Sequence, residues 1–369
     1  MNSQNLINLI KQFSPQQFES ICIVNGAILD LSEVEDMGCK DFWIKSKFSM
    51  PLKLYKYFPD VANQISDREC VNYSIQALER NTVFMQTPSE FDDIYDSDIH
   101  IELFDYERLR LIEYCHRCGI ETNENISAKT AGDLLLKRLY DEGYSVDRFR
   151  KAFETADGNE LIKLSNELFC LRLYQKLQET GDLGKALAEL IKIEYDLYCY
   201  ELKNRFRVSC FATTPYSQLM WGGSYANCHR GFCLEYTVLP SEERYIDLYH
   251  NLFPMIYCKT RPNMSERIVK AKDKEPTLDN LWDIYFHGVL RKSIDWAYQN
   301  EWRLLLLMKR TSNINDYNIE FFPITKVYLG NRMSLEGKNK VIEICKRRNI
   351  PYVGMIRDPN IFEMRECEV

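Results

Sequence analysis

The spacing of apolar and polar residues divides the 369-residue chain into regions of different kinds. Residues 51–100 begin with an apolar and aromatic segment at Leu52–Tyr57, which predicts a strand. A capping box at Ser66–Glu69 precedes apolar residues spaced as one face of a helix. Thr82–Gln86 then predicts a second strand, which ends before Pro88. This region therefore predicts a strand, a helix and a strand in succession.

Residues 101–205 have the pattern of a helical block. No proline occurs between Pro88 and Pro215, and Leu, Lys, Glu and Tyr dominate the composition. One helical face near the end of the block carries Leu183, Leu187, Leu190 and Leu197. We expect these leucines to pack in a core, and we expect the block to lie to one side of a sheet and to offer a surface to a protein partner.

Strand signals return in residues 206–369. Apolar, aromatic or β-branched segments occur at Arg207–Thr213, Gly231–Thr237, Met255–Lys259, Trp302–Met308, Lys326–Leu329 and Pro351–Ile356. Two predicted helices interrupt them, one over Leu278–Trp296 and one that is capped by Ser334 and runs to Arg347.

The simplest architecture for this order of elements is α+β, with a mixed sheet built from both ends of the chain and a large all-helical insertion. Residues 1–50 would form an N-terminal extension, residues 51–100 and 206–369 the α+β core domain, and residues 101–205 the helical insertion. Leu52–Tyr57 and Trp302–Met308 should share one sheet, because both segments are too apolar for separate exposed edges.

Composition and charge favour a globular protein of the cytoplasm. Hydrophobic residues make up 45% of the chain and charged residues 27%. The net charge of −7 does not indicate nucleic acid as a partner. The 13 cysteines are scattered singly, which is typical of reduced thiols rather than a disulfide framework. No signal peptide and no apolar run of membrane-spanning length is present, so we expect no membrane association.

Candidate chemistry is concentrated in segments that mix aromatic, charged and small residues. They are Leu54–Tyr57, Pro88–Asp96, Cys210–Thr213 with Trp221–Phe232, and Lys292–Arg303. Each is too polar for an ordinary core and too aromatic for an ordinary surface.

Taken in order, these segments resemble a bacterial family of uncharacterised proteins called "domain of unknown function 2971". That family carries a Lys-Tyr pair, an acidic turn after a phenylalanine, a Cys-Phe-Ser strand, a loop with Trp, Tyr-Ala, His and Gly, and a Trp-x-Tyr-Glu-x-Glu-Trp-Arg strand entry. The chain departs from this pattern at Ile94, Ala212 and Gln299. The resemblance implies kinship and weakly suggests a toxin or phage-defence setting; it supplies no activity.

The strand entry and the glycine-rich loop offer different chemistry. Glu301 and Arg303 are two apart on a predicted strand, so they share one face, either as a carboxylate held by a guanidinium at a cleft or as a surface ion pair. Trp221 and Tyr225 could form one aromatic wall if their stretch is helical. His229 adds a titratable group, or is simply buried in a tight connection.

Metal binding has weak support in the sequence. Asp92, Asp93 and Asp96 could bind a hard cation, but turn-forming aspartates commonly satisfy their own backbone instead. Cys115–Cys118 and Cys228-His229 lack the second ligand pair of a structural zinc site. We therefore assign no metal ligands.

The leading hypothesis is an enzyme resembling ADP-ribosyltransferases that use NAD. Those enzymes carry a basic or polar residue on an early strand, an aromatic or Ser/Thr strand in the centre, and a late Glu/Gln-x-Glu element. The catalytic candidates are Lys56, Gln299 and Glu301, with Glu301 as the carboxylate that stabilises the cationic ribose. The substrate-binding candidates are Tyr57, Phe211, Thr213, Trp221, Tyr225, His229 and Arg303.

Two alternatives remain open. The same residues could form a non-catalytic nucleotide- or partner-binding module, or Asp92, Asp93 and Glu301 could support metal-assisted hydrolysis. We expect the Glu301 carboxylate to face a cleft shared with at least two of Lys56, Trp221, Tyr225 and His229. If the cleft is catalytic, Glu301→Gln should abolish turnover and leave folding nearly unchanged.

Overall fold

The computed structural model describes residues 19–59, 63–66, 69–123, 125–141, 172–173, 175–271, 278–307 and 317–369. The chain divides into two compact units. The first unit comprises Met1–Ser97, Lys203–Arg261 and Val289–Val369, and it contains the strands. The second unit comprises Asp98–Leu202 and Pro262–Gly288, and its described elements are helices. The expected α+β class is confirmed.

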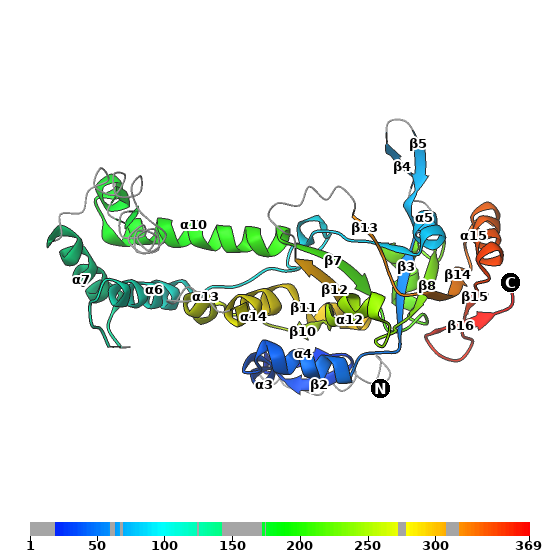
Figure 1. Cartoon of the computed structure of the whole chain (residues 1–369), viewed down its shortest axis with the longest axis horizontal. Helices are drawn as coiled ribbons and strands as arrows, with labels where there is room; N and C mark the ends of the chain where they lie inside the picture. The colour runs from blue at the N-terminus through cyan, green and yellow to red at the C-terminus, as the bar shows by residue number, and fades with distance from the viewer. Residues whose placement is uncertain are drawn as a thin grey trace. The chain divides into compact units, whose positions relative to one another are not determined.

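A five-stranded sheet forms the main core of the first unit (Figure 1). Its strands, in spatial order, are β16 (Met364–Cys367), β15 (Tyr352–Arg357), β14 (Ile324–Leu329), β8 (Phe232–Thr237) and β3 (Lys53–Phe58). β14 and β15 run parallel because α15 (Leu335–Arg348) forms the crossover between them. The sheet therefore combines one strand from the first part of the chain with strands from the last part, as expected.

A second sheet of three strands lies next to β3. Its order is β7 (Phe206–Phe211), β12 (Trp302–Leu307) and β9 (Leu252–Pro254). β3 meets β7 at a single bridge, in which the backbones of Tyr55 and Ala212 exchange hydrogen bonds of 2.9 and 2.7 Å.

The expectation that Leu52–Tyr57 and Trp302–Met308 share one sheet is wrong. β3 pairs with β8 along its whole length on one side, and on the other side only Tyr55 pairs. The continuous ladder therefore ends at this bridge, and β12 belongs to the three-stranded sheet. The two segments still lie close together, because β7 touches both of their strands.

A four-stranded sheet joins the N-terminal residues to the same unit. Its order is β11 (Arg291–Ser293), β10 (Ile256–Cys258), β1 (Ile21–Val24) and β2 (Ala27–Asp30). Helix α3 (Leu31–Glu35) follows β2, and α4 (Cys39–Phe48) follows α3. Residues 21–30, which we expected in an N-terminal extension, thus provide two strands of a sheet whose other strands come from the second half of the chain.

Shorter elements connect these sheets. They are β4 (Asn63–Ser66), β5 (Glu69–Asn72), α5 (Tyr73–Arg80), β6 (Thr82–Phe84), η1 (Pro88–Glu90), α11 (Gln218–Gly222), η2 (Ser224–Ala226), η3 (Glu243–Tyr245), α12 (Ile246–His250), η4 (Ile294–Gln299) and β13 (Asn318–Glu320). The helix expected directly after Ser66–Glu69 begins only at Tyr73, because Glu69–Asn72 pair with β4. Ile75 and Leu78 are buried as the helical stripe predicts.

The second unit contains α6 (Leu103–Arg117), α7 (Ala128–Asp141), α10 (Leu183–Asn204), α13 (Ser265–Ala271) and most of α14 (Leu278–Val289). α6 packs against α7 and α13 (Figure 1). Of the predicted leucine stripe, Leu187 and Leu190 are buried in the core of this unit, whereas Leu197 is 57% exposed. Residues 142–171 of the expected helical insertion lie outside the described part of the chain.

Residues 262–288 belong to the helical unit although we expected them in the α+β domain. The backbone of His100 bonds to Pro262 and Met264, and the Ser265 hydroxyl accepts from the Glu102 N–H at 2.9 Å. These bonds tie α13 to the start of α6. Within the described residues, no helix combines the length and the apolar composition needed to cross a membrane.

Candidate functional site

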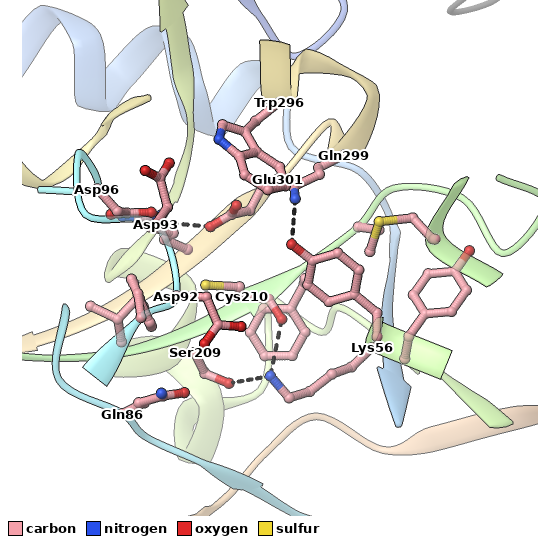
Figure 2. Close-up of a pocket in the computed structure, with 18 of the residues that line it drawn as sticks. Lys56, Gln86, Asp92, Asp93, Asp96, Ser209, Cys210, Trp296, Gln299 and Glu301 are labelled. Carbon is pink, nitrogen blue, oxygen red and sulfur yellow. Dashed lines mark hydrogen bonds and ion pairs between the residues drawn. The ribbon is translucent and has the colours of Figure 1, made fainter. Parts of the chain in front are cut away.

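A cavity of about 570 Å³ opens in the first unit where the sheets meet. Its wall contains residues of β3 and β7, the segment 84–96, the start of η2, and the segment 292–303. Figure 2 shows Trp296, Gln299 and Glu301 on one side of this space, Lys56 and Ser209 on the opposite side, and Asp92, Asp93 and Asp96 on a third. Segments from four distant parts of the sequence therefore converge on one pocket.

The strand order brings the predicted pieces together. β7 lies between β3 and β12, so the strand of Lys56, the strand of Phe211 and the strand that follows Glu301 are neighbours. The register pairs Arg303 with Cys210 and Trp302 with Phe211. Lys56, Phe211 and Glu301 all line the cavity.

A left-handed turn aims Glu301 into the site. η4 begins at Ser293, whose hydroxyl caps the Asp295 N–H, and ends at Asn300 with φ of 40°. Asn tolerates this conformation better than most residues. The Asn300 side chain also donates to the Thr213 hydroxyl at 2.6 Å. The predicted helix over Leu278–Trp296 ends early at Val289, which leaves β11 and η4 to form this wall.

Lys56 is a half-buried lysine on the cavity wall, and its amine contacts neutral oxygen atoms. Its amine donates to the Ser209 hydroxyl at 3.0 Å and to the Cys210 carbonyl at 3.1 Å, and it lies over the Phe211 ring (Figure 2). Among the described residues, no carboxylate lies within ion-pair distance of it. Burial lowers the pKa of Lys56, and the negative charge of nearby Glu301 opposes that shift.

Glu301 belongs to a buried network of two carboxylates and two cations. One Glu301 oxygen accepts from Arg303 at 2.6 Å, and the other lies 3.2 Å from the Lys292 amine. Asp96 accepts from both terminal nitrogens of Arg303, at 2.8 and 2.5 Å. The side chains of all four are at most 8% exposed. The surface ion-pair alternative for Glu301 and Arg303 is therefore wrong.

The network keeps Glu301 ionised. Burial by itself raises the pKa of this carboxyl, but the charges of Arg303 and Lys292 outweigh it and lower the pKa to about 2. Burial raises the pKa of the neighbouring Cys210 thiol to about 12, so Cys210 is protonated and is not an activated nucleophile.

Gln299 is held between Lys292 and Tyr225. The Lys292 amine donates to the Gln299 carbonyl oxygen at 3.0 Å. The Gln299 amide nitrogen donates to the Tyr225 hydroxyl at 2.5 Å, the bond drawn from Gln299 in Figure 2. Burial raises the pKa of Tyr225 to about 12, so its phenol is protonated at neutral pH.

Residues 220–304 match the family model described as "Protein of unknown function (DUF2971)". The resemblance that the sequence motifs suggest is confirmed over this range. The DUF2971 match contains Tyr225, Lys292, Gln299, Glu301 and Arg303, but neither Lys56 nor the strand β7. Comparison with curated proteins and with solved structures found no match.

Two members of the expected cleft are absent from the cavity wall. Lys56 and Tyr225 line it together with Glu301, whereas Trp221 and His229 do not. α11 ends at Gly222, so Trp221 and Tyr225 do not share one helix. Trp221 is fully buried instead, and its indole N–H donates to the Pro215 carbonyl at 2.7 Å.

Of the remaining predicted substrate-binding residues, three line the cavity and two do not. Tyr57, Phe211 and Arg303 line the cavity, although Arg303 is fully occupied by its carboxylates and the Tyr57 hydroxyl donates to the Thr214 carbonyl at 2.8 Å. Thr213 holds Asn300 and does not line the cavity. His229 lines a separate open groove. Sequence spacing could not show in which direction the Thr213 and His229 side chains point, because each direction depends on a turn between elements.

The acidic turn lies on the cavity wall but is not arranged as a metal site. Asp93 accepts from the Tyr95 N–H at 2.9 Å, as expected of a turn, and Asp96 is bound to Arg303. Within the described part of the chain, no group of three or more His, Cys, Asp or Glu side chains is placed to hold a metal ion. The metal-assisted hydrolase therefore has no supporting ligand set among the described residues.

Lys292 and Ser209 are site residues that the sequence motifs did not single out. Lys292 lies in the fourth motif segment, nine positions before Glu301. Ser209 directly precedes the Cys-Phe pair of β7. The sequence signal for both residues was that they lie close along the chain to predicted site residues. The structure shows that Lys292 contacts both Gln299 and Glu301.

Proposed function

We propose that the cavity is the NAD site of an ADP-ribosyltransferase-like enzyme. One observation supports this proposal most. Lys56 on β3, the strand β7, and the pair Gln299 and Glu301 just before β12 all line one pocket. These three strands are neighbours. This is the early, central and late order of elements that the resemblance to such enzymes requires. A pocket of about 570 Å³ lies within the usual range for small-molecule sites.

The chemistry follows from the charges on the wall. Cleavage of the bond between nicotinamide and ribose leaves positive charge on the ribose, and a fixed carboxylate nearby stabilises that charge. Glu301 is ionised at every physiological pH and cannot rotate freely, because Arg303 and Lys292 hold both of its oxygens. On the opposite wall, the Lys56 amine uses two of its three donors on Ser209 and Cys210, which leaves one for an oxygen-rich part of the dinucleotide.

The direct test is release of nicotinamide from NAD by the purified full chain, with water as the acceptor of ADP-ribose. We expect turnover, and we expect Lys56→Met to lower kcat/KM at least tenfold, because a charged hydrogen-bond donor on the cavity wall is lost. Lys53→Met is the matched control, since Lys53 lies on the same strand, is half-exposed and does not line the cavity.

A second candidate is a non-catalytic nucleotide-binding module in a toxin or phage-defence setting. The observation that favours it is that Arg303 and Lys292 already neutralise Glu301, which weakens the field that a cationic intermediate would experience. Melting curves with and without NAD separate the two. A ligand at 100 times its Kd adds about 2.7 kcal/mol of stability, so stabilisation by NAD without nicotinamide release would support the module.

A further inference from the structure

We propose that Lys292 is a positioning residue that turns Gln299 into a hydrogen-bond donor, and that Gln299 and Tyr225 together bind the carbonyl oxygen of the nicotinamide carboxamide. The inference rests on the proposed function, since it names the group that NAD presents to this wall. Hydrogen bonds link the three side chains, from Lys292 to Gln299 and from Gln299 to Tyr225.

The orientation of the Gln299 amide follows from the chemistry of its neighbour. A lysine ammonium has three N–H donors and no acceptor. The Lys292 amine lies 3.0 Å from the Gln299 side chain, 3.2 Å from Glu301 and 3.4 Å from Asp96. Each of its donors therefore has an oxygen partner, and the Gln299 atom that faces Lys292 must be the carbonyl oxygen.

The other end of the amide is then committed to donation. One Gln299 N–H goes to the Tyr225 oxygen at 2.5 Å, and the second remains for a ligand. Because Tyr225 accepts from Gln299, its own O–H is available, and no described residue accepts it within hydrogen-bond distance. Both side chains line the cavity, so two hydrogen-bond donors are available to a ligand at this point.

A carbonyl oxygen has two lone pairs and fits this pair of donors. The surrounding wall favours attachment of that carbonyl to a flat ring, because Trp296 and Tyr298 line the cavity with ring centres 6.1 Å apart. Nicotinamide joins an aromatic ring to a carboxamide and is the part of NAD that meets both features. The Gln299 and Tyr225 donors use the oxygen of the carboxamide and make no demand on its nitrogen.

Because Gln299 and Tyr225 donate hydrogen bonds to the ligand, we expect the protein to discriminate among NAD analogues. The acetylpyridine analogue keeps the carbonyl oxygen and replaces the amide nitrogen by a methyl group, whereas a plain pyridine analogue lacks the carbonyl. By titration calorimetry we expect the acetylpyridine analogue to bind within about threefold of NAD and the plain pyridine analogue to bind about tenfold more weakly or worse, since one or two hydrogen bonds are lost.

Variants test whether the selectivity depends on the Tyr225 hydroxyl and the Gln299 amide. Tyr225→Phe removes one donor and should weaken NAD and the acetylpyridine analogue by a similar factor, about five- to tenfold. Gln299→Glu replaces the donors by a carboxylate that accepts from both Lys292 and Tyr225, so it should abolish the preference for a carbonyl. Tyr352→Phe is the matched control, because Tyr352 is in the same unit and does not line the cavity.

Lys292→Met tests the positioning role. With Lys292 absent, the Gln299 amide is free to turn and can accept from the nicotinamide amide nitrogen, so NAD should be preferred over the acetylpyridine analogue by more than threefold. A purely structural role would weaken both ligands equally. Equal binding of the plain pyridine analogue and NAD by the unmodified protein, or unchanged selectivity in Gln299→Glu, would overturn the inference. Absence of any NAD binding by the unmodified protein would overturn the proposed function itself.

Discussion

Both oxygens of the Glu301 carboxylate contact buried cations, so removing its charge alters folding as well as chemistry. The sequence led us to expect that Glu301→Gln leaves folding nearly unchanged, and the buried network reverses that expectation. Breaking one partner of a buried ion pair leaves an uncompensated charge. We therefore expect the variant to lose about 3 kcal/mol in its free energy of unfolding, measured by urea denaturation.

The control for this change is Asp295→Asn, which removes an exposed carboxylate from the same segment. Its free energy of unfolding should change by less than about 0.5 kcal/mol. Equal stability of Glu301→Gln and the unmodified protein would show that the network contributes nothing to folding, and the variant would then be a clean probe of catalysis.

The same carboxyl gives a pH dependence with a defined sign. Its pKa falls from 4.5 to about 2 on folding, so the unfolded chain binds more protons in that interval. The stabilisation is complete above pH 4.5 and is lost as the pH falls toward 2. Other carboxyls titrate in the same interval, so the measurement is the difference in stability between the unmodified protein and Glu301→Gln. That difference should shrink as the pH falls from 5 to 3; a constant difference would contradict it.

At the scale of elements, the junction between η4 and β12 decides whether the site forms. Asn300 has φ of 40° and binds Thr213 through its side chain. Asn300→Ala removes that bond and places a residue with little tolerance for this conformation at the turn, so we expect a loss of about 2 kcal/mol. Asn300→Gly loses the bond but keeps the conformation, and it should lose less. Thermal melts of both variants separate the cost of backbone strain at residue 300 from the loss of the hydrogen bond. Equal losses of stability in the two variants would assign the whole effect to the hydrogen bond.

Element types were largely predictable because they depend on local pattern. The stripe with Ile75 and Leu78 correctly gave α5, and the apolar segments gave β3, β7, β8 and β12. Element boundaries were less accurate where pairing overrode propensity. Glu69–Asn72 form a strand because β4 lies beside them, and the helix predicted to run to Trp296 ends at Val289.

At the scale of the whole molecule, the division into two units predicts which deletions fold. Removing 98–202 alone leaves 262–288 without His100 and Glu102, which hydrogen-bond to it, and without α6, against which α13 packs, so we expect exposed apolar surface and binding of a hydrophobic dye. Removing both segments should leave the first unit folded. The ends of the first deletion lie together, because Lys203 donates to the Ile94 carbonyl at 3.0 Å and Ser89 to Asn204 at 3.0 Å.

Circular dichroism and a cooperative urea transition would check the double deletion. The second gap separates β10 and β11, which pair in parallel, so the double deletion needs a linker of about a dozen residues in place of 262–288. A double deletion that remains unfolded while the single deletion folds would show that the units are not independent.

The sequence by itself determined the α+β class, the helical character of the described part of 101–205, and the membership of Lys56, Tyr225, Gln299 and Glu301 in candidate segments, because periodicity and motif composition are local properties. Only the tertiary structure decided which partners each side chain meets. Asp96 precedes Arg303 by more than two hundred positions, yet the two share a buried bidentate contact. Such a contact depends on long-range strand pairing and turn geometry. No local pattern encodes the direction in which Trp221 or His229 leaves the backbone.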